Sequence, residues 1–116
     1  MERIGHYINN KIVINEKNRS APVYNPANGQ QIAEVEMGAE SEVGSAVSAA
    51  AEAFEGWSKT PPVVRARVLF RFRDLIESHR DDLAQSITTQ HGKVLSDAQG
   101  EITRGLEVVE LSLIHI

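Results

Sequence analysis

Cysteine is absent from all 116 residues of the sequence. Within this chain, its absence excludes a disulfide framework, a thiolate zinc site and a cysteine nucleophile. Aromatic residues make up only 5% of the chain, so a core must be mainly aliphatic and rich in alanine. No apolar run approaches the roughly 20 residues that a membrane-spanning helix needs. The first ten residues lack the apolar centre of a secretory signal and the acid-poor composition of a transit peptide, which makes the cytoplasm the expected location.

Basic charge is also scarce. Twelve Lys and Arg residues stand against sixteen Asp and Glu residues, and the net charge is −4. Because phosphate backbones are bound by basic surfaces, we expect no nucleic-acid partner, and we expect no membrane partner either. Neither a glycine-rich phosphate loop nor a nucleophile elbow is present. Length and composition therefore indicate one acidic globular domain and no particular activity.

Residues 1–37 have the pattern of β-strands. Asn9 and Asn10 separate two short apolar runs, and asparagine tolerates the positive φ of a tight hairpin turn. The segment 25–29, NPANG, is strong turn punctuation. Residues 31–37 then alternate polar and apolar side chains, with Ala33, Val35 and Met37 on the apolar side, which predicts a half-buried strand.

After Gly38 the apolar period becomes helical, and four amphipathic helices are expected. Ser41 is the expected cap of the first. Its stripe comprises Val43, Ala46, Val47, Ala50, Phe54 and Trp57. Thr60-Pro61-Pro62 predicts the start of the second, over about 63–78, with Thr60 as cap and a proline at the first helical position.

Two further helices are expected to begin at capping boxes, Ser78 with Asp81 and Ser96 with Gln99. Gly92 suits the left-handed position that ends the third helix. Two sides of the last helix are apolar, which predicts that it is covered on two sides. One side carries Ala98, Ile102, Leu106, Val109 and Leu113. The other side carries Arg104, with Val108 and Leu111 near it on the helix surface.

Arg104 is the candidate binding residue. Gly100 and Gly105 flank it, and each costs the helix about 1 kcal/mol relative to alanine. Glycines kept in a helix at such a cost allow close approach of another backbone or of a ligand. A cation there could hold an anion, and the alternative is a surface arginine paired with Glu101 or Glu107. Other candidates have plainer interpretations. The arginines of the second helix read as a solvated face, and His91 reads as a last-turn residue that favours the helix dipole; no metal site is predicted. Those arginines are Arg65, Arg67, Arg71 and Arg73.

Five segments of the sequence resemble the N-terminal part of the aldehyde dehydrogenase superfamily. They are HYINNKIV at 6–13, APVYNPANGQQIAEV at 21–35, AAAEAFEGWSKTPPVVRARVLFRFRDLIE at 49–77, ITTQHGKVLSDAQGE at 87–101 and TRGLEVVE at 103–110. NPANG and AFEGWS are superfamily signatures. RARVLFRF and HGKVLSDAQGEITRGLEVVE are narrower and resemble the CoA-acylating methylmalonate-semialdehyde (malonate-semialdehyde) dehydrogenases.

This resemblance implies an α/β fold in which residues 1–110 are the N-terminal segment of an aldehyde dehydrogenase domain that also needs a Rossmann-like cofactor sheet and a catalytic domain. It implies an NAD-dependent enzyme that converts methylmalonate or malonate semialdehyde and CoA to propionyl-CoA or acetyl-CoA, in valine, pyrimidine or inositol catabolism. The complete enzyme is expected to be a homotetramer. In the family, a cysteine forms a thiohemiacetal with the aldehyde, and hydride leaves to NAD.

The same resemblance assigns one role within these residues. The arginine of the GE-x-x-RG motif, here Arg104 in GEITRG, is implicated in holding the substrate's carboxylate. No catalytic or cofactor-binding residue is assigned, and the chain alone is expected to be inactive. Residues 111–116 depart from the family pattern and are expected to be a non-family tail that follows a truncation. Two alternatives stay open: a non-acylating NAD(P)-dependent aldehyde dehydrogenase, and a stand-alone α+β interaction module.

Overall fold

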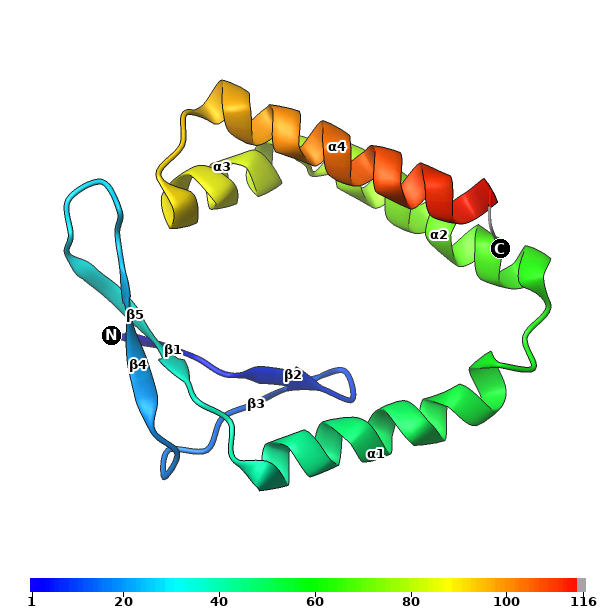
Figure 1. Cartoon of the computed structure of the whole chain (residues 1–116), viewed down its shortest axis with the longest axis horizontal. Coiled ribbons are helices and arrows are strands. Elements are labelled where there is room, and N and C mark those ends of the chain that lie inside the picture. The colour runs from blue at the N-terminus through cyan, green and yellow to red at the C-terminus, as the bar shows by residue number, and fades with distance from the viewer. Residues whose placement is uncertain (115–116) are drawn as a thin grey trace. The chain divides into compact units, whose positions relative to one another are not determined.

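The computed structural model describes residues 1–114, and the chain divides into two units, Met1–Lys59 and Thr60–Ile116. The first unit contains β1 (Glu2–Ile4), β2 (His6–Ile8), β3 (Lys11–Val13), β4 (Ser20–Tyr24), β5 (Gln31–Glu36) and α1 (Glu40–Trp57). The second contains α2 (Pro62–Ser78), α3 (Arg80–His91) and α4 (Leu95–Ile114). Strands followed by four helices confirm the predicted α/β class (Figure 1).

Two hairpins form where turn residues predicted them. β2 and β3 pair antiparallel around Asn9 and Asn10, whose φ angles are 50° and 60°. β4 and β5 pair antiparallel around the NPANG turn, in which the N–H of Gly29 donates to the carbonyl of Asn25 at 2.8 Å. Gly29 has φ 71°, a conformation that glycine adopts without steric cost. Both turns confirm the sequence interpretation.

β1 completes a three-stranded sheet of order β1-β5-β4 by pairing parallel with β5, with Glu2 opposite Ala33. The interior side of β5 differs from the expected alternation. Ala33 is buried as predicted, but Met37 is 47% exposed and Glu36 is buried instead. The expectation for Met37 was wrong because β5 ends at Glu36, where the carboxylate meets donors from a distant loop.

α1 begins at Glu40, two residues before the start that a cap at Ser41 predicts. Ala39 precedes the helix and Ser41 lies inside the first turn, so Ser41 is not the cap. Glu42 takes that role by accepting a hydrogen bond from the N–H of Ala39 at 2.9 Å. β2 lies alongside α1 (Figure 1). Most of the predicted apolar stripe is left uncovered by the described residues, and Val43, Val47 and Phe54 are 60–66% exposed.

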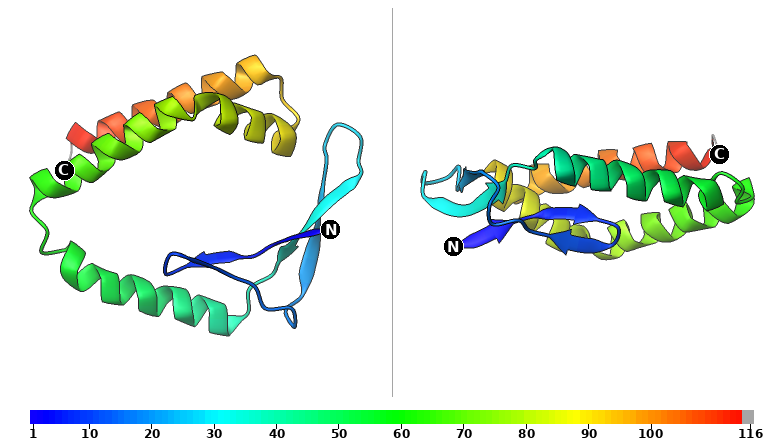
Figure 2. Two further views of the ribbon diagram at one scale, coloured as in Figure 1. Left: turned by 180° about the vertical axis from the view of Figure 1, so that it is seen from behind. Right: turned by 90° about the horizontal axis from the view of Figure 1, so that it is seen from below.

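In the second unit, α2 and α3 both pack on α4 (Figure 2). The buried core consists of Ala84, Ala98, Ile102 and Leu106. Ile102 and Leu106 belong to the predicted stripe of α4, whereas Val108 and Leu111 on its other side are more than half exposed. One side of α4 is therefore covered as predicted, whereas its other side is open within residues 1–114, so the predicted cover on two sides is not found among the described residues.

The starts of α3 and α4 correct two predicted capping boxes. His79 precedes α3, and the hydroxyl of Ser78 instead donates to the carbonyl of Leu75 at 3.0 Å. The carbonyl of Val94 accepts the first hydrogen bonds of α4, so Ser96 lies two positions too late to cap it. α2 begins at Pro62, with Pro61 rather than Thr60 before it.

The ends of these helices need less correction. Gly92 follows α3 with φ 84°, which confirms the left-handed cap. α4 continues through residues 111–114, while residues 115–116 lie outside the described residues. Within residues 1–114, no helix combines the length and the apolar character that crossing a membrane requires.

Candidate functional site

Arg104 lies in the middle of α4 with an exposed side chain. Within residues 1–114, no hydrogen bond or ion pair ties its guanidinium to another residue. The flanking glycines leave space, because a Cβ added at Gly100 or Gly105 would meet no atom within 4 Å beyond its own stretch of helix. The guanidinium therefore projects from an uncrowded helix surface, with its donors available to a group from outside this chain segment.

The alternative interpretation paired Arg104 with Glu101, but the carboxylate of Glu101 has a different partner. Lys93 Nζ donates to Glu101 Oε1 at 2.6 Å. This hydrogen bond is the main cause of the lowered pKa of Glu101; burial opposes it, and the charges of Lys93, His91 and Arg104 add to it. The positive charge of Arg104 thus helps to lower the pKa of Glu101, but Lys93 is the residue that donates a hydrogen bond to it.

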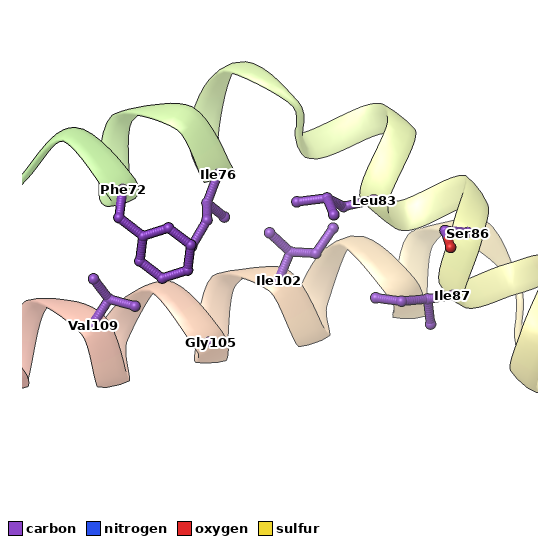
Figure 3. Close-up of a pocket in the computed structure, with 8 residues that line it drawn as sticks. All are labelled: Phe72, Ile76, Leu83, Ser86, Ile87, Ile102, Gly105 and Val109. Carbon is purple, nitrogen blue, oxygen red and sulfur yellow. The ribbon is translucent and has the colours of Figure 1, made fainter. Parts of the chain in front are cut away.

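An apolar groove of about 470 Å³ lies along α4, between it and the two helices that pack on it (Figure 3). It is lined by Phe72, Ile76, Leu83, Ser86, Ile87, Ile102, Gly105 and Val109. Only Ser86 offers a polar side chain, so the groove suits an apolar group and holds no reactive chemistry. One of the lining residues, Gly105, directly follows Arg104 in the chain.

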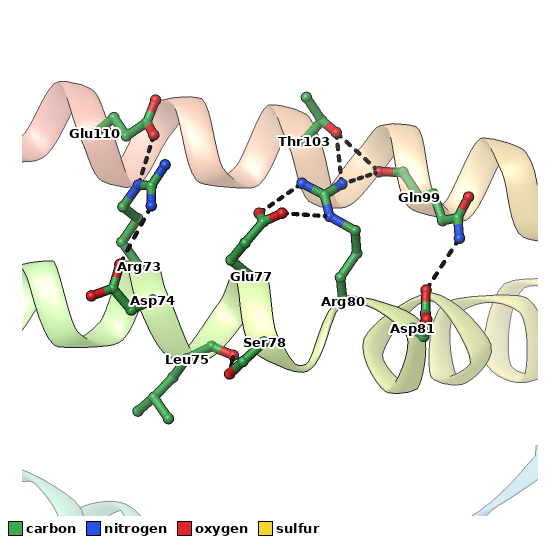
Figure 4. A network of polar contacts seen from close by, with 10 residues as sticks. All are labelled: Arg73, Asp74, Leu75, Glu77, Ser78, Arg80, Asp81, Gln99, Thr103 and Glu110. Carbon is green, nitrogen blue, oxygen red and sulfur yellow. Dashed lines mark hydrogen bonds and ion pairs between the residues drawn. The ribbon is translucent and has the colours of Figure 1, made fainter.

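An ion pair joins α2 to α4, and hydrogen bonds join the start of α3 to α4, along the outside of the second unit (Figure 4). Arg73 Nε donates to Glu110 Oε1 at 2.9 Å, and this hydrogen bond is the main cause of the raised pKa of Arg73. Arg80 binds Glu77 at 2.8 Å and the hydroxyl of Thr103 at 2.9 Å. For Arg73 the structural interpretation of the arginine-rich helix is confirmed.

A second polar cluster, which we call the Glu36 cluster, lies in the first unit and was not anticipated from the sequence. The buried carboxylate of Glu36 accepts hydrogen bonds from the N–H of Asn15 at 2.8 Å and from Asn18 Nδ2 at 2.7 Å. His6 Nε2 lies 3.6 Å from it. Arg3 completes the cluster by donating to the carbonyl of Asn18 at 2.9 Å. These residues are far apart in the chain, so no local pattern could have revealed them.

The surroundings of Glu36 and Glu42 favour the ionised form of both carboxylates. Burial would raise the pKa of Glu36, but the hydrogen bonds from Asn15 and Asn18 and the nearby positive charges outweigh it and lower the pKa. The hydrogen bond from the N–H of Ala39 is the main cause that lowers the pKa of Glu42 to about 2. The carboxylate oxygens of Glu36 and Glu42 accept hydrogen bonds from donors of the same unit, so the arrangement is structural.

Among residues 1–114, no group of three or more His, Asp or Glu side chains is placed to hold a metal ion. His91 is exposed at the end of α3, next to the left-handed Gly92. Among the candidates from the sequence, Arg104 is an exposed arginine with unused hydrogen-bond donors, and the open space at Gly100 and Gly105 lies beside it.

Known proteins resemble this chain in sequence and in structure. The aldehyde dehydrogenase family model matches residues 13–115. A malonate-semialdehyde dehydrogenase of Bacillus pumilus is 41% identical over 112 residues, which are 97% of this chain and 23% of that protein. The malonate-semialdehyde dehydrogenase of Pseudomonas aeruginosa is 41% identical over 110 residues, 95% of this chain and 22% of that protein.

The crystal structure of methylmalonate-semialdehyde dehydrogenase from Oceanimonas doudoroffii superposes with a TM-score of 0.94 at 43% identity, over 97% of this chain and 23% of that one. A Sinorhizobium meliloti protein described as the same type of enzyme, solved with NAD, superposes with a TM-score of 0.93 at 35% identity, with the same coverage of both chains. The chain therefore spans less than a quarter of the length of these relatives and reproduces that part of their fold.

Proposed function

The chain belongs to the aldehyde dehydrogenase family, and we propose that it forms the N-terminal part of a CoA-acylating methylmalonate- or malonate-semialdehyde dehydrogenase. The names of the relatives support the substrate class, and the NAD-bound relative supports the cofactor. In the proposed reaction, the aldehyde is oxidised by NAD and its acyl group passes to CoA. The carboxylate carbon leaves as carbon dioxide and NADH is formed, so the acyl group of the product, propionyl-CoA or acetyl-CoA, is one carbon shorter than the semialdehyde. The enzyme is proposed to be a cytoplasmic homotetramer.

Within these residues, Arg104 is proposed to bind the carboxylate of the semialdehyde. A guanidinium presents two parallel donors that match the two oxygens of a carboxylate. Such an anchor at one end of a short substrate fixes the position of the aldehyde carbon at the other end. The single observation that supports this role is the exposed guanidinium of Arg104, which has no hydrogen-bond partner within residues 1–114.

Replacement of Arg104 by leucine in the complete enzyme tests this proposal. We expect kcat/KM for malonate semialdehyde to fall roughly 30-fold or more, as when one member of a desolvated charge pair is removed. Propanal has no carboxylate, so its kcat/KM should barely change. Arg67→Leu is the matched control, because Arg67 is an exposed arginine on α2 and should leave both substrates unaffected. Equal losses on both aldehydes would instead make Arg104 a structural residue.

The product identifies the branch of the family. In the presence of CoA, the proposed enzyme should release an acyl-CoA thioester, which chromatography with mass detection identifies. A free acid as the only product would exclude the acylating reaction and support the alternative of a non-acylating aldehyde dehydrogenase, in which water takes the acyl group.

The 116-residue chain alone is proposed to be inactive. It has no cysteine to form the thiohemiacetal, so no hydride donor can arise at the aldehyde carbon. Incubation of the chain with malonate semialdehyde, NAD and CoA should give no NADH absorbance above a protein-free blank. NADH formation that depends on both chain and aldehyde would contradict this.

A further inference from the structure

The availability of Arg104 needs an explanation, because a suitable anion lies one helical turn away. Glu101 precedes Arg104 by three residues, and an acidic residue on the N-terminal side of a basic one at this spacing is the favourable order for an ion pair. An isolated helix with this sequence would pair the two side chains. In the structure they are not hydrogen-bonded, and Lys93 Nζ donates to Glu101 Oε1 instead.

Lys93 is well placed to hold Glu101. It belongs to the short connection between α3 and α4, directly after the left-handed Gly92, so the chain direction there is fixed by the turn. The Nζ–Oε1 distance is 2.6 Å, and the side chains of Lys93 and Glu101 are only 23% and 39% exposed. Partial burial reduces solvent screening, so this pair is better defined than a fully exposed pair on a helix.

We propose that Lys93 is a positioning residue that keeps Arg104 free for the substrate by occupying Glu101. This inference rests on the proposed role of Arg104 in binding a carboxylate. Without Lys93, the carboxylate of Glu101 turns to the guanidinium of Arg104, and an incoming substrate carboxylate must displace it. The competition is between two carboxylates for one guanidinium, so it acts on substrate binding and leaves the reacting atoms untouched.

The test compares Lys93→Met with Glu101→Gln in the complete enzyme. Both variants break the same ion pair, but only Lys93→Met leaves a free carboxylate beside Arg104. We expect Lys93→Met to raise KM for malonate semialdehyde about two- to fivefold, the range of an exposed ion pair, with kcat and the kinetics of propanal unchanged. Glu101→Gln should leave KM unchanged or lower it. The double variant should return to the KM of Glu101→Gln, and Lys93→Arg should keep the original value.

Each outcome decides the inference. If the pair only holds the α3–α4 connection, Lys93→Met and Glu101→Gln will have the same effect on both aldehydes, and the inference fails. If Lys93→Met changes nothing while Arg104→Leu loses activity selectively on the carboxylated aldehyde, the inference fails and the proposed function stands. Glu107→Gln is the matched control, because Glu107 follows Arg104 in the unfavourable order and should have no effect. If Lys93→Met does not fold, Lys93→Gln is measured in the same way.

Discussion

Residues 1–59 enclose a carboxylate, that of Glu36, whereas the buried side chains of residues 60–114 are all apolar. In the first unit, Glu36 at the end of β5 accepts two hydrogen bonds from the loop that follows β3, and His6 of β2 lies 3.6 Å from its carboxylate, so directed polar contacts hold these segments together. In the second, three helices are held by packing around Ile102 and Leu106, and their ion pairs lie outside the core. The two units should therefore respond to different perturbations: the first to loss of charge, the second to loss of volume.

The largest expected effect concerns the chain as a whole. Both units leave apolar faces uncovered within residues 1–114, around Phe54 on α1 and Val108 on α4. Apolar patches of more than a few hundred Å² mark interfaces or sites of aggregation. We therefore expect the 116-residue chain, expressed alone, to be poorly folded or to aggregate, as size-exclusion chromatography with light scattering would show. A monomer with a sharp, reversible thermal transition would contradict this and support the stand-alone module.

Replacement of Ile102 by alanine is expected to act on the second unit. Ile102 is 7% exposed in the core, and removal of a buried isoleucine side chain costs about 2–5 kcal/mol of unfolding free energy. In the complete enzyme, amide hydrogen exchange should accelerate over residues 60–114 and stay unchanged over 1–59. Glu107→Ala on the same helix is the control and should stay within about 0.5 kcal/mol of the original protein, since Glu107 is a charged, exposed residue. Equal acceleration in both units would show that they unfold together.

Acid is expected to act first on residues 1–59. The pKa of Glu42 is about 2 in the folded protein against an ordinary value of 4.5, and the pKa of Glu36 is also lowered. Because the folded pKa lies below the unfolded one, their contribution to stability is complete above pH 4.5 and is lost as the pH falls towards about 2.

Carboxylates outside the core of the second unit, such as Glu77, also have a lowered pKa, but the core itself does not titrate. Amide exchange at stepwise lower pH should therefore show residues 1–59 opening at a higher pH than 60–114. At neutral pH, Glu36→Gln should speed amide hydrogen exchange over residues 14–19. Glu77→Gln is the control and should leave exchange over these residues unchanged, because Glu77 is exposed and lies in the other unit. Simultaneous opening of both units would remove the distinction between them.

Local chemistry explains what the sequence could predict. The hairpin at Asn9-Asn10, the turn at Gly29 and the helix end at Gly92 each depend on a residue that tolerates positive φ, and each was predicted correctly. The apolar period likewise identified Ile102 and Leu106 as core residues of α4. These signals lie within a few residues of the structure that they specify.

Two errors concern the exact start of a helix, and the others arise where distant residues decide. The positions of Ser41 and Ser96 fit a cap, but the helices begin before them because Ala39 and Val94 already supply the first carbonyl acceptors. Glu36 looked like the solvent side of a strand, and its donors come from Asn15 and Asn18, which no local pattern connects with it. Glu101 looked like a partner for Arg104 until Lys93, outside the helix, proved to hold it.

The parallel pairing of β1 with β5 has a consequence for the order in which the first unit assembles. Each hairpin closes over a few residues and can form as soon as its own strands exist, whereas Glu2 must wait until Ala33 is available. Closing a longer loop costs more chain entropy, and contacts between distant residues slow folding. During synthesis, residues 2–4 emerge before their partners at 33–35 and are therefore among the last residues of this unit to reach their native place.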